Sequence, residues 1–275
     1  MISPLSRKGN ARSRGNSIDE LRGLLSSGLT VASICEELFC FGEDEDALKA
    51  KTKLEEYGFD LAGIRDKQTG SVVGWVEGKK LSKGTCADCM NRLNGSDIVS
   101  SSLPLEDLLH RLSEVRFFFV VMNYGISSIV TRADMHKNPM RLLILGYISL
   151  LEMHLTSCVT KYYPDASWKE HIEKKHVDDA KKIFKRLRER NENGSLEECL
   201  SFRDKLELSR KSKDLRLLFE LDQDDADDNM IDSIVDLRND VAHANRCFVG
   251  RGGWPKISLA VQTISKMIMK SEARM

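Results

Sequence analysis

The chain has 275 residues, of which 41% are hydrophobic and 31% are charged. This composition supplies enough apolar surface for one large core or two modest ones, so a wholly disordered chain is excluded. The 42 basic and 42 acidic side chains cancel. No overall charge excess therefore holds the protein on nucleic acid or on a membrane surface, and any such contact must be local.

The beginning of the chain is basic, with no apolar core and no cleavage pattern of small residues, so it does not read as a secretory signal. We expect a flexible basic tail over residues 1–27. The longest apolar runs, 117–121 and 142–151, are shorter than the ~18–20 residues that cross a bilayer, so no membrane partner is expected. An odd number of cysteines, seven, favours a reducing compartment and predicts a cytoplasmic protein.

Two adjacent segments of similar pattern follow the tail. The first predicts a helix within 43–58 and two strands within 59–76, and the second predicts a helix over 104–115, a strand over 116–122 and a strand leading into a helix over 126–139. The offset of about 54 residues is typical of an internal duplication, in which two copies pack against each other because one cannot bury both faces. Between them, a C-x-x-C with no second ligand pair favours ordinary thiols over a metal site.

The end of the second copy carries a motif suited to binding a nucleoside. Residues 128–134 read Ser-Ile-Val-Thr-Arg-Ala-Asp, where Asp134 can accept hydrogen bonds from ribose hydroxyls and Thr131 can hold phosphate. This stretch resembles the adenosine site of tandem CBS (cystathionine-β-synthase-type) domain pairs, with Ser128 in place of the family's glycine. The resemblance covers residues 28–140 and implies an adenine nucleotide (AMP, ADP, ATP or S-adenosylmethionine) as a regulatory ligand.

The matching positions of the first copy differ in chemistry. Residues 74–80 place Glu77 where the motif has threonine and Lys80 where it has aspartate, so we expect this copy not to bind a nucleotide in the same way. The alternative for the second copy is structural, because Asp134 can cap the helix that follows it without any ligand.

From residue 140 onward the pattern is helical throughout. It predicts an all-α bundle of about five helices over residues 141–275. The fold class is therefore α+β, with an α/β pair followed by a helical domain. The helices are expected within 140–163, 167–190, 195–221, 228–246 and 257–275.

One helix of this bundle combines an arginine with a histidine. Arg238 follows Ile231 by seven residues and Ile234 by four, which places it on the apolar stripe of the helix. An unpaired guanidinium in a core is costly, so Arg238 must meet a buried acid or face a subunit interface. His243 lies roughly 140° further around the helix. Two such helices meeting across a two-fold axis would bring both residue types into one cleft.

This Arg-Asn-x-x-x-His arrangement resembles the HEPN family (higher eukaryotes and prokaryotes nucleotide-binding), many of whose members are metal-independent endoribonucleases. The resemblance implies a homodimer that cleaves RNA, with Arg238, Asn239 and His243 as catalytic residues and no cofactor for catalysis. A histidine can move the 2′-hydroxyl proton, and an arginine can neutralise charge on the phosphorane. The alternatives are an arginine that only builds an interface, or a coincidence of six positions.

The segment 168–190 carries nine Lys or Arg against five Asp or Glu, which suits RNA phosphates or an ordinary solvated helix face equally. Together these patterns predict a nucleotide-regulated, metal-independent endoribonuclease of a toxin, stress or defence type. The alternative is a non-catalytic nucleotide-binding regulator or an RNA-binding module that uses the helical domain for dimerisation.

Overall fold

The computed structural model describes residues 18–221, 225–242 and 253–274. The chain divides into two compact units, one of residues 26–143 and the other of residues 1–25 and 144–275. Helix α1 (Ile18–Gly28) occupies the end of the segment expected to be a tail. Two acidic residues in its first turn, Asp19 and Glu20, complement the positive end of the helix dipole.

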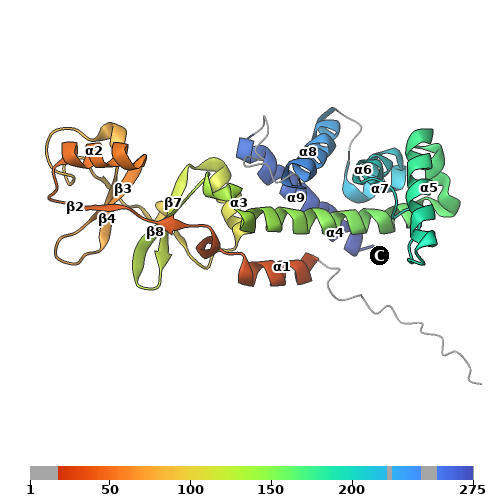
Figure 1. The fold of residues 1–275 in the computed structure, drawn as a ribbon, viewed down its shortest axis with the longest axis horizontal. Helices are drawn as coiled ribbons and strands as arrows, with labels where there is room; N and C mark the ends of the chain where they lie inside the picture. The colour runs from red at the N-terminus through yellow and green to blue at the C-terminus, as the bar shows by residue number, and fades with distance from the viewer. Residues whose placement is uncertain (1–17, 222–224, 243–252, 275) are drawn as a thin grey trace, which may run out of the picture. The chain divides into compact units, whose positions relative to one another are not determined.

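The unit of residues 26–143 contains two four-stranded sheets, one with the order β2-β3-β4-β5 and the other β1-β8-β7-β6. One helix packs with each sheet, α2 (Ala47–Tyr57) with the first and α3 (Leu105–Glu114) with the second (Figure 1). The strands are β1 (Glu36–Glu37), β2 (Cys40–Gly42), β3 (Leu61–Arg65), β4 (Val72–Glu77), β5 (Asn91–Arg92), β6 (Ile98–Ser100), β7 (Phe117–Met122) and β8 (Gly125–Thr131).

The two sheets are copies of one plan. In each, a short strand pairs in parallel with the first strand of an antiparallel hairpin, as β2 does with β3 and β6 with β7. The fourth strand comes from the other copy: β1, which begins the first copy, pairs with β8, and β5, which begins the second, pairs with β4. The predicted duplication is therefore present as a reciprocal exchange of leading strands.

Local signals fix the first copy. The Asp46 side chain accepts the backbone N–H of Lys49 at 2.9 Å and caps α2, which ends at Gly58 with φ +70°. In the turn between β3 and β4, Asp66 accepts the backbone N–H of Thr69 at 2.7 Å and its hydroxyl at 2.8 Å. Such aspartate-based turns compete with continuation of a strand, so the chain reverses there.

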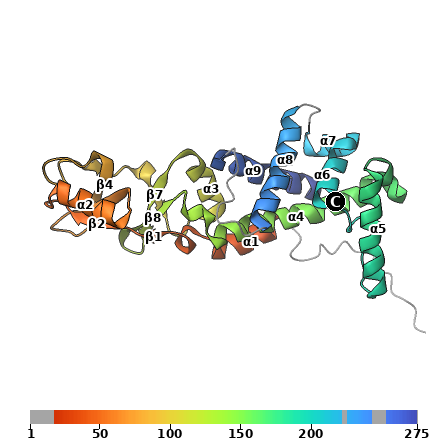
Figure 2. The ribbon, with the colours of Figure 1, turned by 45° about the horizontal axis from the view of Figure 1, so that its top comes forward.

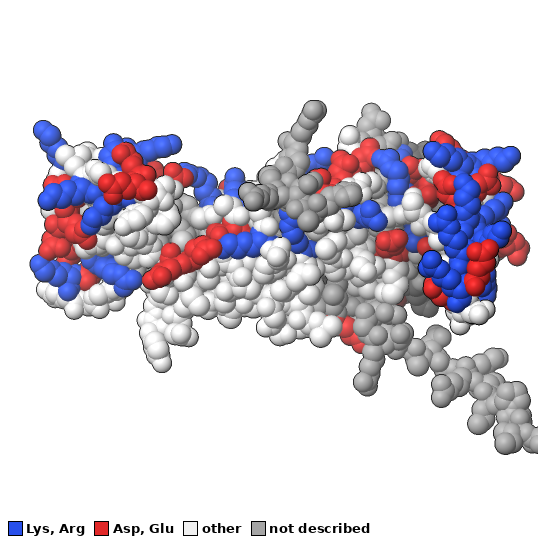
Figure 3. All heavy atoms as spheres, viewed as in Figure 1, with Lys and Arg blue, Asp and Glu red and all other residues white. Residues whose placement is uncertain are grey.

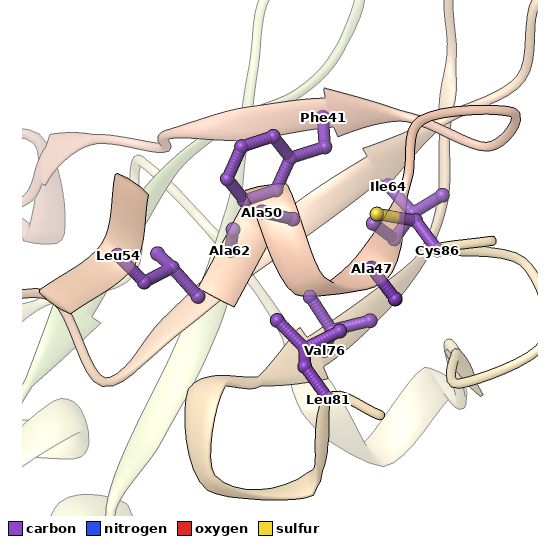
Figure 4. Close-up of a cluster of buried hydrophobic side chains, with 9 residues drawn as sticks. All are labelled: Phe41, Ala47, Ala50, Leu54, Ala62, Ile64, Val76, Leu81 and Cys86. Carbon is purple, nitrogen blue, oxygen red and sulfur yellow. The ribbon is translucent and has the colours of Figure 1, made fainter. Parts of the chain in front are cut away.

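The core of the first copy lies between α2 and its sheet (Figure 4). Small residues on α2, Ala47 and Ala50, let the helix approach the strands closely, while Phe41 and Ile64 fill the space from the sheet side. Cys86 of the C-x-x-C is one of these core side chains, and burial raises the pKa of its thiol to about 11. Cys86 is thus a packed, protonated thiol rather than an exposed ligand.

The second unit is helical. Helices α8 and α9 pack side by side in both views (Figure 2). Ser212 separates α6 from α7, since its side chain accepts the backbone N–H of Leu215 and caps the second helix. The helices are α4 (Asn138–Tyr162), α5 (Lys174–Glu189), α6 (Phe202–Lys211), α7 (Lys213–Phe219), α8 (Asp225–Ala242) and α9 (Gly253–Glu272).

Helix α5 is shorter than its sequence pattern suggested, because residues Pro164–Glu170 form a 3-10 turn in which Asp165 and Ala166 have positive φ. Trp168 of this turn is fully buried, and its indole N–H donates to Glu197 at 2.9 Å. This anchor holds the turn against the helical unit and prevents α5 from starting earlier.

By length and composition, α4 is apolar enough to cross a membrane, but 56% of its most apolar window is buried inside the protein. Its charged residue Glu152 accepts a hydrogen bond from the ammonium of Lys205 at 3.1 Å. Only 3% of the Lys205 side chain is exposed, against 36% for Glu152. The helical core therefore contains an ion pair in which the lysine is buried away from solvent.

Candidate functional site

The loop after β8 is organised around one carboxylate. The Asp134 side chain is 9% exposed, and its Oδ2 accepts both the backbone N–H of Thr131, at 2.7 Å, and the Thr131 hydroxyl, at 2.9 Å. The Thr131 hydroxyl oxygen in turn accepts the backbone N–H of Ala133 at 3.2 Å. The two residues that the sequence singled out therefore meet, and they hold each other in place.

Lys137 holds the other oxygen of this carboxylate. Its ammonium donates to Asp134 Oδ1 at 2.8 Å and to the carbonyl oxygen of Ile34 at 2.6 Å, and it also pairs with Glu36. Burial acts to lower the pKa of Lys137, but hydrogen bonds to Asp134 and Glu36 outweigh it and raise this pKa above its usual value. The lysine stays charged and ties the start of the first copy to the end of the second.

Arg132 fixes the same loop from its other side. Its Nε donates to the carbonyl oxygens of Leu112, at 2.9 Å, and Val115, at 2.8 Å, and its Nη2 donates to that of Ser113 at 3.0 Å. These carbonyls lie at the C-terminal end of α3, where no helical N–H is available and a cation is favoured. The loop position is thereby set by α3 as well as by β8.

A cavity of about 560 Å³ opens beside this loop, within the range of sites that take a small organic ligand. It lies where the two copies meet, because both contribute to its walls. Residues 36–39 and 58–61 come from the first copy, and 116–117, Ile129, Thr131, Ala133 and Asp134 come from the second.

Aromatic side chains form much of the cavity's apolar wall. Phe39 and Phe59 line it, and their ring centroids are 5.6 Å apart. Phe117 lines it from β7 and packs edge-on against Trp75, with centroids 5.2 Å apart. Flat rings beside a carboxylate and a hydroxyl provide both a stacking surface for a heteroaromatic base and acceptors for sugar hydroxyls.

The strand registers show which residues of the two copies occupy equivalent positions. Glu77 pairs with Leu61 at the start of β3, as Thr131 pairs with Phe117 at the start of β7. In place of the Thr131–Asp134 contact, the first copy has an ion pair between Glu77 and Lys80 at 2.9 Å. The predicted difference in chemistry between the copies is thus present in the structure, with charged side chains occupying the equivalent corner.

The residues predicted for catalysis lie on α8. Ile231, Ile234 and Val235 are buried as expected, whereas Arg238 is exposed and so does not meet a buried acid. The other expectation, that Arg238 faces a subunit interface, stays a prediction. An arginine side chain is long enough to carry its charge to solvent from the edge of an apolar stripe. Its Nη1 donates to Oδ1 of the exposed Asn239 at 3.2 Å. His243 lies outside the described residues, so its distance from Arg238 is not defined.

Lys and Arg side chains gather over α5, at the right-hand end of Figure 3. Several are paired with acids of the same helix, including Lys182 with Asp179 at 2.9 Å and Lys181 with Asp178 at 3.9 Å. Arg186, Arg188 and Arg190 are exposed. The basic surface is therefore partly neutralised near the start of α5 and becomes more basic toward its end.

Solved structures of CBS domains are similar to about two-fifths of the chain. CBSX2 in complex with AMP aligns at 20% identity over 42% of this chain and 98% of its own, with a TM-score of 0.37. The CBS domains of a transcriptional regulator from Streptococcus pneumoniae align at 20% identity over 40% and 99%, with a TM-score of 0.35. The CBS domain of a bacterial CNNM/CorC family Mg²⁺ transporter in complex with ATP aligns at 17% over 46% and 94%, also at 0.35. No family model and no curated protein matches the chain.

Proposed function

We propose that residues 28–140 are a CBS-type pair that binds an adenosine-based ligand in the cavity between its two copies and acts as a regulatory module. The observation that carries this proposal is the cavity itself, which combines Asp134 and Thr131 with the rings of Phe39 and Phe117. The base would stack on the rings, and the ribose would face the carboxylate.

Asp134 has a limited capacity for the ribose. A carboxylate offers about four lone-pair sites, and the Thr131 N–H, the Thr131 hydroxyl and Lys137 occupy three of them. One lone-pair site remains for a ligand hydroxyl, and a second becomes free if Lys137 turns away. Asp134 therefore shapes the loop and keeps one acceptor site for the ribose. The structural alternative differs from the one expected, because no side-chain cap is made to the 3-10 turn Asp134–His136.

Filling the cavity should weaken binding. We expect calorimetry to detect at least one of AMP, ADP, ATP and S-adenosylmethionine with the full chain, and Ile129→Trp to weaken that binding by roughly thirtyfold or more, since the indole occupies the ligand's volume. Ile126→Trp is the matched control, because Ile126 lies on the same strand and does not line the cavity. Equal binding by wild type and Ile129→Trp, or none by wild type, would contradict the proposal.

A second candidate function concerns the helical unit. Among the described residues, Arg238 has no acidic partner within ion-pair distance, and its only hydrogen bond is to Asn239. An exposed, unpaired guanidinium beside an amide is suited to a phosphate. This observation favours contact with RNA, and with it a metal-independent endoribonuclease of the HEPN type in which Arg238, Asn239 and His243 of a homodimer act.

Cleavage of labelled RNA in EDTA tests this candidate. We expect products with 2′,3′-cyclic phosphate ends, and a loss of at least about a hundredfold in rate for Arg238→Ala and for His243→Ala. Lys256→Ala removes an exposed cation of the same unit and serves as the control. Salt-sensitive binding of intact RNA would instead indicate an RNA-binding module, and light scattering that shows an active monomer would exclude the composite dimer site.

A further inference from the structure

The charges around the cavity between the two copies are unbalanced. Among the described residues, four carboxylates and one guanidinium line it. The acids come from three separate segments of the chain. They are Glu36, Glu37, Asp60 and Asp134, and the single lining cation is Arg116.

The nearby cations, Lys137 and Arg116, do not form an enclosed site for a phosphate. The ammonium of Lys137 is shared among Asp134, Glu36 and a backbone carbonyl, which leaves it no free direction toward a ligand. The guanidinium of Arg116 lies 4.0 Å from Glu77, and its side chain is 68% exposed. Neither cation is therefore an uncommitted, enclosed partner for a phosphate.

Two of the carboxylates remain uncompensated. Within the described parts of the chain, neither Glu37 nor Asp60 has a basic side chain within 4.0 Å, and both are exposed at the cavity. Each of these carboxylates repels an anion that enters the cavity. The repulsion is stronger than in bulk water, because the cavity is partly enclosed.

We propose that this cavity selects a nucleoside that carries little or no negative charge, either neutral or cationic, over nucleoside di- and triphosphates. The proposal rests on the proposed function of the same cavity and specifies its ligand class. The Phe39, Phe59 and Phe117 rings supply binding to the base whatever the ligand's charge, so the carboxylates decide which tail is accepted. A positively charged tail, such as the sulfonium and ammonium of S-adenosylmethionine, would face Glu37 and Asp60.

Calorimetry on the full chain with adenosine, AMP, ATP, S-adenosylmethionine and S-adenosylhomocysteine tests the proposal. We expect affinity to fall roughly tenfold with each step from adenosine to AMP to ATP, and S-adenosylmethionine to bind more tightly than S-adenosylhomocysteine, which lacks the sulfonium charge. At ~0.5 M salt these differences should shrink, because the exposed carboxylates are screened.

Neutral variants identify the groups responsible. Glu37→Gln and Asp60→Asn should each improve ATP binding several-fold more than adenosine binding, and Asp107→Asn on α3, an exposed residue away from the cavity, should alter neither. ATP binding as tightly as adenosine to wild type would overturn the charge preference and leave the proposed function intact. Failure of all five probes to bind would overturn both.

Discussion

Replacement of Glu152 by alanine is expected to lower the free energy of unfolding by about 3 kcal/mol or more, because it leaves the ammonium of Lys205 buried without its partner. Lys205 is 2% exposed and lies on α6, and Glu152 is the acid that pairs with its ammonium. Denaturant unfolding followed by circular dichroism measures the loss.

The double variant Glu152→Ala with Lys205→Met is the informative control. Removing both charges replaces the pair with apolar groups, which is often neutral or stabilising, so the double variant should regain most of the stability that the single one loses. A loss below about 1 kcal/mol in the single variant would show that Lys205 finds water or another acceptor in solution.

Arg132→Met is expected to lower the free energy of unfolding of the β-containing unit by about 2–4 kcal/mol, because three carbonyl oxygens at the end of α3 lose a charged donor. The same change should weaken binding in the cavity, since Arg132 stands between Thr131 and the rest of the loop that Asp134 organises. Thermal melting and calorimetry on one preparation report the two effects separately.

Arg132→Lys and Arg92→Met are the matched variants for this test. A lysine keeps the charge but cannot place donors on all three carbonyls at once, so its effect should be intermediate. Arg92 is an exposed arginine in β5, and its replacement should change stability by less than about 0.5 kcal/mol. Equal stability of Arg132→Met and wild type would mean that water satisfies the end of α3 equally well.

The sequence alone predicted the repeat and the part of the candidate site that Thr131 and Asp134 form. Helix and strand periodicity predicted the two copies, and the spacing of Thr131 and Asp134 predicted that they act together, because both signals are local. The lining from residues 36–39 and from Arg116 was missed, since these segments reach the cavity only through packing of the two copies. Asp60 and Arg116 immediately precede the equivalent strands β3 and β7. Comparison of the two copies could therefore have indicated that both residues lie at the same kind of position.

The helical unit shows the limit of periodicity. The apolar stripe through Ile231 and Ile234 was predicted correctly, but Arg238, which the same spacing placed on that stripe, is exposed. A helical wheel ranks positions by angle, while exposure at the edge of a stripe depends on side-chain length and on how far the neighbouring helix extends. His243 stays a prediction.

The exchange of β1 and β5 between the copies bears on how such a unit can arise and be divided. A single copy has no fourth strand of its own, so the outer edge of its hairpin, β4 or β8, would present unpaired backbone groups. One copy alone could close its sheet only by trading leading strands with a second chain. The present unit therefore resembles a strand-swapped dimer whose two halves are joined in one chain, and a chain cut between residues 80 and 91 should yield halves that are soluble only when they are produced together.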